Sequence, residues 1–168
     1  MSSREGAASG APAIHITPLG TRGVRIPSPI PGLFNLGGKV LVWTYRRLGG
    51  LWSRTGFRMV LLTTHGAKTG RPRTSPLGGF TYGENAWLVV GSNAGSARHP
   101  AWLFNMAEHP DDISLEVGRQ RLKVRAQTLE GPERAEALSH IATIAPPYVN
   151  YQQKTDREIP IVRLTRET

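Results

Sequence analysis

From residue 58 onward, the sequence is a series of short strand-forming runs separated by turn residues, and this pattern constrains the fold more than any other feature. Apolar and β-branched residues, alternating with polar residues in several runs, predict six strands, at 59–64, 74–82, 86–92, 113–117, 120–129 and 159–164. Helical patterns occupy 100–109 and 132–145 between them. Many strands with few, short helices indicate a mainly β fold of the α+β class. We expect a six-stranded, mostly antiparallel barrel with attached helices.

The first 57 residues differ in composition and form two further parts. Residues 1–31 contain 17 Gly, Pro, Ala or Ser residues and no strand or helix period, which predicts a disordered or loose N-terminal arm. Residues 32–57 repeat apolar side chains at helical spacing with an interruption at Gly49–Gly50, which predicts one broken helix or two short ones. The predicted organisation is therefore an arm (1–31), a helical element (32–57) and a barrel domain (58–168).

The helical element is basic and amphipathic. Its cations fall within one sector about 100° wide, beside a broad apolar face. They are Lys39, Arg46, Arg47 and Arg54. Three interpretations remain open: a helix packed on its own barrel with a solvated basic edge, a helix docked on an anionic membrane surface, or a site for a partner protein.

Positive charge is unevenly placed along the chain. Residues 1–73 carry 11 Lys and Arg against one acidic residue, whereas 74–168 carry 10 against 11, so the formal net charge of +9 arises in the first part. A local excess of this kind favours separate anionic partners over a nucleic acid contacted by the whole surface.

Several classes of protein lack support in the sequence. Without cysteine there are no disulfides, zinc fingers or thiol nucleophiles. The five histidines show no metal-ligand spacing and are expected at the surface or as caps, and no GxSxG or paired-carboxylate motif occurs. No apolar run could span a bilayer, and the first thirty residues lack the apolar centre of a secretory signal, which predicts a cytoplasmic protein. If the basic helix binds a membrane, the protein is expected to be peripheral on the inner face of the plasma membrane.

The segment HGAKTGRPRTSPL concentrates positive charge on a tight bend. Pro72 cannot donate a ladder hydrogen bond, which predicts a loop over Thr69–Pro72. Lys68 and Arg73 are then expected to face each other, where two cations about 5 Å apart repel by roughly 1 kcal/mol in water. A phosphate or carboxylates would relieve that repulsion, and the alternative is an exposed turn with screened charges. The upstream glycine and following helix of a P-loop are absent.

Three blocks of the sequence resemble, in order and spacing, the deazaflavin-dependent nitroreductase family of actinobacteria, also called the coenzyme F-420-dependent reductases. The blocks are LLTTHGAKTGRPRTSPL, GSNAGSARHPAWLFNM and PPYVNYQQKTDREIPIV, and the resemblance covers about residues 58–165. It implies a split β-barrel that binds an 8-hydroxy-5-deazaflavin whose tail carries a phosphate and a chain of glutamates. FMN is the less favoured alternative cofactor.

By position, the resemblance assigns cofactor-binding residues to the first two blocks. For the phosphate and glutamyl tail it implies Lys68, Thr69, Gly70, Arg71 and Arg73. Beside the deazaflavin ring it implies Ser92, Asn93, Gly95, Pro100, Ala101 and Trp102. A helix starting at Pro100 would direct its positive dipole to that region, and the alternative for Trp102 is an ordinary core aromatic.

The third block is expected to supply the substrate side. Tyr148 and Tyr151 are three residues apart, share a helical face and match tyrosines that line the family's substrate pocket. Each is a candidate catalytic proton donor, with Ser92 beside them, because a phenol with a pKa near 10 is protonated at neutral pH. The alternative for both tyrosines is packing at the barrel mouth. Asp156 and Arg157 are expected to be structural.

The implied activity is hydride transfer from the reduced deazaflavin to an electron-poor small molecule, such as an enone, a quinone or a nitro compound. The alternative is a non-catalytic split-barrel module that binds deazaflavin, flavin or haem. No nucleic-acid partner is expected, because aromatic residues do not interleave with the cations of the bend. Both a monomer and a homodimer remain open.

Departures from the family pattern affect how the coenzyme tail is expected to bind and how wide the substrate pocket is expected to be. Ala67 stands where the family usually has an arginine, and Asn93 where a lysine is often found, so either the coenzyme binds more weakly or Arg71 and Arg98 hold its tail. Ala145 replaces an aromatic residue of some relatives, which leaves the width of the substrate pocket open.

Overall fold

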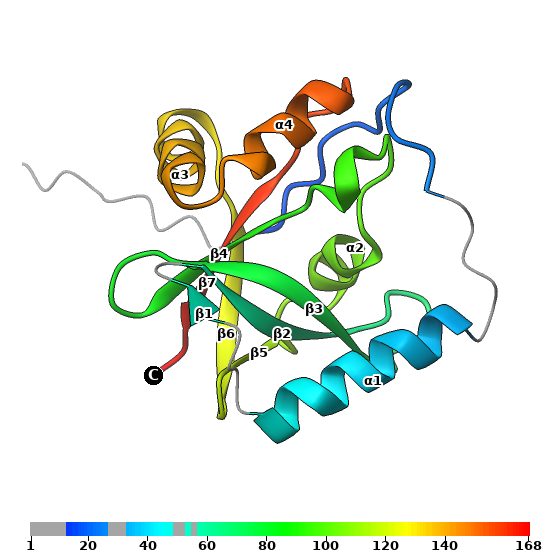
Figure 1. Cartoon of the computed structure of the whole chain (residues 1–168), viewed down its shortest axis with the longest axis vertical. Helices are drawn as coiled ribbons and strands as arrows, with labels where there is room; N and C mark the ends of the chain where they lie inside the picture. The colour runs from blue at the N-terminus through cyan, green and yellow to red at the C-terminus, as the bar shows by residue number, and fades with distance from the viewer. Residues whose placement is uncertain (1–12, 27–32, 49–52, 55–56) are drawn as a thin grey trace, which may run out of the picture.

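The computed structural model describes residues 13–26, 33–48, 53–54 and 57–168, which contain a closed barrel of antiparallel strands (Figure 1). The barrel strands are β2 (Phe57–His65), β3 (Pro72–Thr81), β4 (Ala86–Val90), β5 (Ser114–Val117), β6 (Gln120–Thr128) and β7 (Ile161–Arg166). Their order is β2-β3-β4-β7-β6-β5, and β5 pairs with β2 to close the ring. The two-residue strand β1 (Ser53–Arg54) also pairs with β2. The predicted six-stranded barrel is confirmed.

Helices cover the barrel on opposite sides. The described helices are α1 (Leu33–Leu48), α2 (Ala101–Glu108), α3 (Gly131–Ile144) and α4 (Pro147–Lys154), with a 3-10 turn, η1 (Asn93–Gly95). In Figure 1, α3 and α4 lie together above the barrel and α1 lies below it. The helix predicted from Pro100 starts one residue later, because Pro100 has the extended conformation of a cap (φ −67°, ψ 149°).

Two apolar clusters form the core. In β6, buried Leu122, Val124 and Ala126 alternate with exposed residues, as expected for a strand with one face inward. They join residues of the other strands and of α2 in the first cluster. The second cluster packs the outer face of the barrel against α3, through Phe80, Leu88, Ala137 and Ile141 among others. Because the two clusters occupy opposite faces of the same strands, they fix the strand register.

Residues 13–26 run against the barrel, which differs from the predicted loose arm. Main-chain hydrogen bonds join Ala13 O to Thr128 N (3.1 Å), Gly20 N to Ala97 O (2.9 Å) and Val24 N to Gly95 O (2.9 Å). Their partners lie more than 70 residues away, so local composition could not reveal them. The remainder of the predicted arm, 1–12 and 27–31, lies outside the described residues, and the domain boundaries stay predictions.

The predicted helical element of residues 32–57 contains a single described helix, α1, followed by strand β1. Tyr45 anchors α1 to the barrel: its side chain is 1% exposed, and its hydroxyl accepts from Gly118 N (2.8 Å) and donates to Glu116 O (3.3 Å). Arg46 adds a two-point ion pair with the Glu116 carboxylate, at 2.9 and 2.6 Å. One face of the helix therefore packs on its own barrel, and the docking of its exposed face on a membrane or a partner protein stays a prediction. The side chain of Arg54 lies outside the described residues.

Candidate functional site

The basic bend forms a six-residue loop, Gly66–Arg71, between β2 and β3; we call it the basic loop. It is closed by a hydrogen bond from Gly66 N to Arg71 O (2.9 Å), and the N–H groups of Thr69 and Gly70 both donate to Gly66 O (3.0 and 2.7 Å). Gly70 has a φ of 63°, in the left-handed region that favours glycine. These contacts leave the side chain of Lys68 exposed at the tip.

The predicted pairing of Lys68 with Arg73 is wrong. Arg73 lies in β3 opposite Thr64, and Pro72 lies opposite His65, so Lys68 belongs to the loop and not to the ladder. The loop also differs from the predicted Thr69–Pro72. The physical reason is that Pro72 is the first residue of β3, a position at which a strand tolerates a missing N–H.

The cations of this region have no acidic partner in the described part of the chain. Lys68, Arg71 and Arg73 are all exposed, and no carboxylate of the described residues lies within ion-pair distance of them. Five other cationic side chains do pair with carboxylates: Arg46, Lys123, Arg125, Arg134 and Arg163. Exposed guanidinium and ammonium groups without counter-charges fit a phosphate or carboxylate ligand.

Residues Ser92–Ser96 form the second part of the candidate site. Asn93, Ala94 and Gly95 have successive φ values of 43°, 52° and 80°, and the Asn93 amide donates to Arg98 O (2.9 Å). A Cβ at residue 95 would lie 2.9 Å from the Lys154 Cβ, so Gly95 allows α4 to approach.

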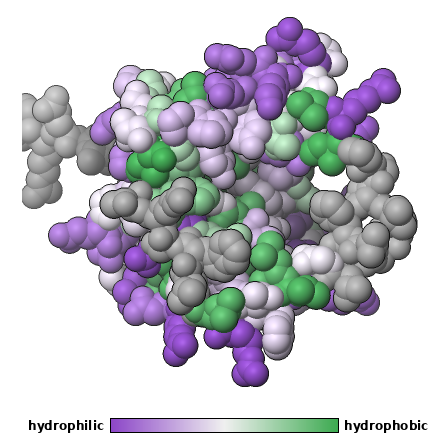
Figure 2. Space-filling model, in the orientation of Figure 1, coloured by the Kyte–Doolittle hydropathy of each residue, from purple (hydrophilic) through white to green (hydrophobic). Residues whose placement is uncertain are grey.

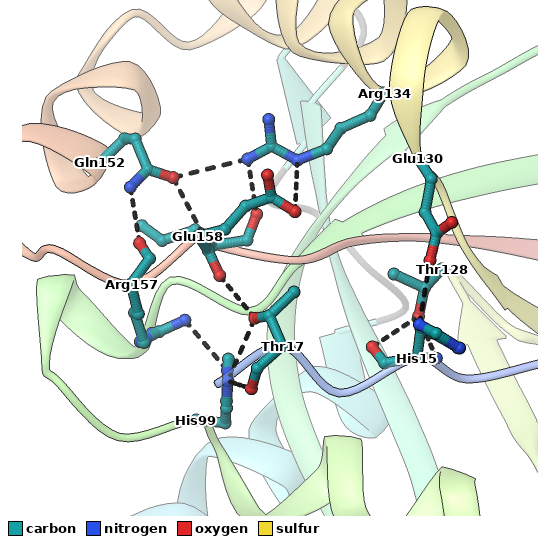
Figure 3. Close-up of polar contacts among 10 residues, drawn as sticks. His15, Thr17, His99, Thr128, Glu130, Arg134, Gln152, Arg157 and Glu158 are labelled. Atoms are coloured by element: carbon teal, nitrogen blue, oxygen red, sulfur yellow. Dashed lines mark hydrogen bonds and ion pairs between the residues drawn. The ribbon is translucent and has the colours of Figure 1, made fainter. Parts of the chain in front are cut away.

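A buried arginine, Arg157, holds this turn through its main-chain carbonyls, and Figure 3 shows its contact with His99. Arg157 is 2% exposed and donates to Ser96 O (2.7 Å) and to Gly91 O and Ser92 O (both 2.9 Å). Its guanidinium also contacts His99 Nδ1 at 3.1 Å. The Asp156 carboxylate accepts hydrogen bonds from the N–H groups of Thr21 and Arg22. These contacts agree with the structural roles expected for Asp156 and Arg157.

His99 is buried, which corrects the expectation of surface or capping histidines. Since a guanidinium only donates, His99 Nδ1 accepts from Arg157, and Nε2–H donates to Thr17 O at 2.8 Å. Burial lowers the pKa of His99, and the nearby Arg157 cation acts in the same direction. The imidazole therefore acts as a neutral link between residues 13–26, the turn after β4 and the segment before β7 (Figure 3).

Tyr148 and Tyr151 lie in an aromatic cluster against β3. Their rings meet edge to face at 5.7 Å, and Tyr148 also meets Phe80 edge to face at 5.2 Å. Lys154 Nζ stands 5.3 Å from the Tyr151 ring centroid. Burial raises the pKa of Tyr148, with a smaller effect from Tyr151, so its phenol stays protonated at neutral pH. Among the described residues its hydroxyl has no hydrogen-bond partner, which leaves a donor for a ligand.

Tyr148 also borders a small cavity. It lies between α3, α4 and β7, is lined by Leu138, Tyr148, Gln152 and Ile159 among others, and has room for about one water molecule. A deazaflavin ring does not fit there, so the cavity is not the cofactor site.

The residues predicted beside the ring at the start of α2 differ in their exposure to solvent. Trp102 is 5% exposed and belongs to the first core cluster, so its side chain is the core aromatic that the sequence left as the alternative. Ala101 is exposed at the start of α2 and Pro100 is half-buried. Only main-chain groups and small side chains of this stretch are therefore accessible.

The three sequence blocks meet in space. Asn105 of α2 hydrogen-bonds Ala67 of the basic loop (3.0 Å), Gly95 packs on α4, and the Tyr148 hydroxyl lies on Gly78 of β3. Sequence reasoning missed Asn105 and Gly78. A polar residue on the buried face of a helix and a Gly–Gly pair inside a strand were the available signals.

Comparison with known proteins supports the family resemblance. A family model described as F420H(2)-dependent quinone reductase matches residues 38–166. The F420H(2)-dependent quinone reductase Rv1261c of Mycobacterium tuberculosis is 39% identical over 112 residues, 64% of this chain and 72% of the relative. The putative F420H(2)-dependent quinone reductase Mb1292c of Mycobacterium bovis has the same identity and coverage.

Solved structures show the same fold. An F420-H2 dependent reductase (FDR-A) superposes with a TM-score of 0.57 at 37% identity, over 63% of this chain and 92% of the other. A second structure, described as a domain-swapped dimer, superposes with a TM-score of 0.59 at 33% identity, over 77% of this chain and 98% of the other. The barrel topology, the arrangement of the three blocks and the match over most of the sequence lead to one conclusion: the chain belongs to the F420H(2)-dependent quinone reductase family.

Proposed function

We propose that this protein is a reductase that uses the reduced deazaflavin coenzyme F-420 to reduce a quinone or a related electron-poor acceptor, such as an enone or a nitro compound. The observation that carries the proposal is the basic loop with Arg73, whose cations lack acidic partners among the described residues. The family match and the names of the relatives point to the same coenzyme.

In this proposal the tail and the ring bind at opposite ends of α2. Lys68, Arg71 and Arg73 receive the phosphate and glutamyl carboxylates, with Thr69 and Gly70 shaping the loop. The main chain of Ser92–Gly95 and of Pro100–Ala101 flanks the ring, close to the N-terminus of α2. Ala67 contributes no charge, so Arg71 compensates for the cation that the family pattern would add to the loop, whereas Arg98 lies beside the ring-side turn.

The tyrosines of α4 act on the acceptor. When bound, the reduced coenzyme supplies a hydride. Tyr148 donates a hydrogen bond to the acceptor oxygen and passes its proton there as negative charge develops, and solvent returns the proton to the phenolate. Tyr151 packs edge to face on Tyr148 and limits its movement, with Ser92 as a further donor near the ring. The protein thus provides orientation and a proton.

Binding is tested by fluorescence titration with coenzyme F-420, with FMN as the comparison. Replacing Lys68→Ala together with Arg73→Ala should raise the dissociation constant at least about tenfold, since each hydrogen bond to a charged group contributes about 1.5–3 kcal/mol. Arg119→Ala with Arg121→Ala removes the same net charge from the exposed end of the β5–β6 hairpin and should leave affinity within about twofold. Equal affinity in both double variants would remove the basis of the proposal.

Turnover separates a reductase from a carrier. With reduced coenzyme F-420 and menadione, the protein should re-oxidise the coenzyme steadily above the protein-free rate. Binding without that acceleration would favour the alternative, a non-catalytic module that holds deazaflavin, flavin or haem.

A second proposal concerns where the enzyme works. We propose that α1 rests on an anionic membrane surface, at the inner face of the plasma membrane near quinones. Its exposed apolar side chains are Val40, Leu41, Trp43 and Leu48, with Trp43 62% exposed. Figure 2 shows hydrophobic side chains at the surface in the lower part of the molecule, where α1 lies in Figure 1. Lys39 and Arg47 are exposed on the same helix, and Arg47 stands over the Trp43 ring. No helix of the described residues is long and apolar enough to cross a bilayer.

Vesicle flotation tests this location. The protein should float with anionic vesicles and not with neutral ones, and Lys39→Glu with Arg47→Glu should abolish flotation. Arg46 is unsuited to this test because Glu116 already engages it. Arg119→Glu with Arg121→Glu is the control for net charge. Flotation that persists in the α1 variant would exclude this surface.

The oligomeric state follows from a separate measurement. Because one relative is described as a domain-swapped dimer, light scattering after gel filtration should be used to decide between the monomer and the homodimer.

A further inference from the structure

Asn105, in the second turn of α2, joins that helix to the basic loop. Its side chain is 8% exposed. Oδ1 accepts a hydrogen bond from Ala67 N (3.0 Å), and Nδ2 donates one to Thr64 Oγ1 (3.1 Å). Ala67 directly precedes Lys68, and Thr64 lies opposite Arg73 in the β2–β3 ladder. One amide thus contacts the loop that carries Lys68 and Arg71, and the β2 residue that lies opposite Arg73.

The other hydrogen bonds of the basic loop join loop residues to one another and not to another element of the described chain. Within the described part of the chain they stay inside the loop: Gly66 N to Arg71 O, Thr69 N and Gly70 N to Gly66 O, and Arg71 N to Thr69 Oγ1. They shape the tip without holding it against another element. The Asn105 contact is therefore the polar link that sets the position of the loop relative to α2.

Holding the loop in place matters for an anionic ligand. Three exposed cations repel one another, and a loop that must be ordered during binding loses affinity to the entropy of ordering. An amide is suited to the task because it offers one acceptor for Ala67 N–H and one donor for Thr64 without adding charge. A buried amide with both groups engaged keeps a single orientation.

We propose that Asn105 is a positioning residue for the coenzyme tail: it holds the basic loop in the conformation that presents Lys68 and Arg71, and so sets affinity for the tail without touching it. This inference rests on the proposed function. It predicts that loss of the amide weakens binding of the tail and leaves binding of the ring unchanged, because Asn105 contacts only the tail side.

The test uses two ligands and one measurement that needs no ligand. The ligands are coenzyme F-420 and its tail-free analogue 8-hydroxy-5-deazariboflavin, titrated by fluorescence. The third measurement is amide hydrogen exchange at Ala67 in the free protein. The variants are Asn105→Leu, which keeps the branching of the side chain and removes both hydrogen bonds, and Asn105→Asp, which keeps an acceptor for Ala67. Leu103→Val on the same helix, a fully buried core position, is the control for stability.

For Asn105→Leu we expect faster exchange at Ala67 and a dissociation constant for coenzyme F-420 about tenfold higher, equivalent to about 1.4 kcal/mol. The dissociation constant for the tail-free analogue should stay within about twofold. Asn105→Asp should retain slow exchange at Ala67, and Leu103→Val should change neither quantity. Unchanged coenzyme affinity in Asn105→Leu, or an equal loss for both ligands, would overturn the inference. A wild-type protein that binds no coenzyme would instead overturn the proposed function, while exchange at Ala67 still decides whether Asn105 holds the loop.

Discussion

Gly78 of β3 provides the sharpest test of the role of Tyr148. Its missing side chain makes room for the Tyr148 hydroxyl, which a Cβ would overlap. The same Cβ would lie 2.6 Å from the Phe57 Cε2 atom, whereas carbon atoms in contact are normally about 3.5–4.0 Å apart. Gly78→Ala should therefore push both rings away from β3 by roughly 1 Å.

The expected magnitudes follow from that displacement. Inserting a methyl group into a packed site costs about 1–3 kcal/mol of stability. A catalytic group misplaced by about 1 Å can lose about 100-fold in rate, so turnover with menadione should fall by about tenfold to 100-fold. The basic loop lies at the other end of β3, so the dissociation constant for coenzyme F-420 should not change.

Gly79→Ala is the matched control. It adds the same methyl group at the next residue, on the opposite face of the strand, where the Cβ would lie 2.8 Å from Val60 Cγ1. It should lower the thermal midpoint by a similar amount, roughly 2–4 °C per kcal/mol, without the specific loss of turnover. Adding Tyr148→Phe to Gly78→Ala should restore part of the stability but not the rate. The steric account is contradicted if the stability changes of Gly78→Ala and Tyr148→Phe add within about 0.5 kcal/mol in the double variant. It is also contradicted if Gly79→Ala slows turnover as much as Gly78→Ala does.

Three further predictions concern the supports of the site. Arg157→Met should lower the free energy of unfolding in urea by about 3 kcal/mol, since it removes the side-chain donor to the carbonyls of Gly91 and Ser96 and one of the two donors to Ser92 O; a loss below about 1 kcal/mol would contradict this account. Because burial lowers the pKa of His99 in the folded state, stability should be full above the unfolded value of about 6.5 and decline as pH falls through the folded pKa. Urea denaturation at several pH values should show that the free energy of unfolding depends less on pH in His99→Gln than in the wild type. Arg46→Ala should cost only about 0.5 kcal/mol, less at high salt, because the Arg46 side chain of the ion pair is half exposed; a salt-independent loss of several kcal/mol would show a different role.

The barrel itself could be predicted from local patterns. Strand periodicity is a property of neighbouring residues: the alternation of Leu122, Val124 and Ala126 identifies β6 and its buried face without knowledge of its partners. Turn glycines are also local signals: Gly83 and Gly118 lie between predicted strands, and both have positive φ values.

Contacts between distant segments decided the rest. Sequence could place cations near residue 70, but the register that opposes Arg73 to Thr64 depends on where β3 starts, because one residue of shift changes every cross-strand pair. Residues 13–26 have the composition of a loose segment, yet Thr17 meets His99 and Thr21 meets Asp156 across more than 80 residues.

By itself, then, the sequence determined the six strands, the basic bend and the order of the three blocks, since these depend on residue type and spacing along the chain. The tertiary structure alone decided that Asn105 holds the basic loop, that Gly95 makes room for α4 and that Gly78 accommodates Tyr148. The physical reason is that a hydrogen bond or a steric fit depends on the distance between two atoms, and closure of the barrel sets that distance.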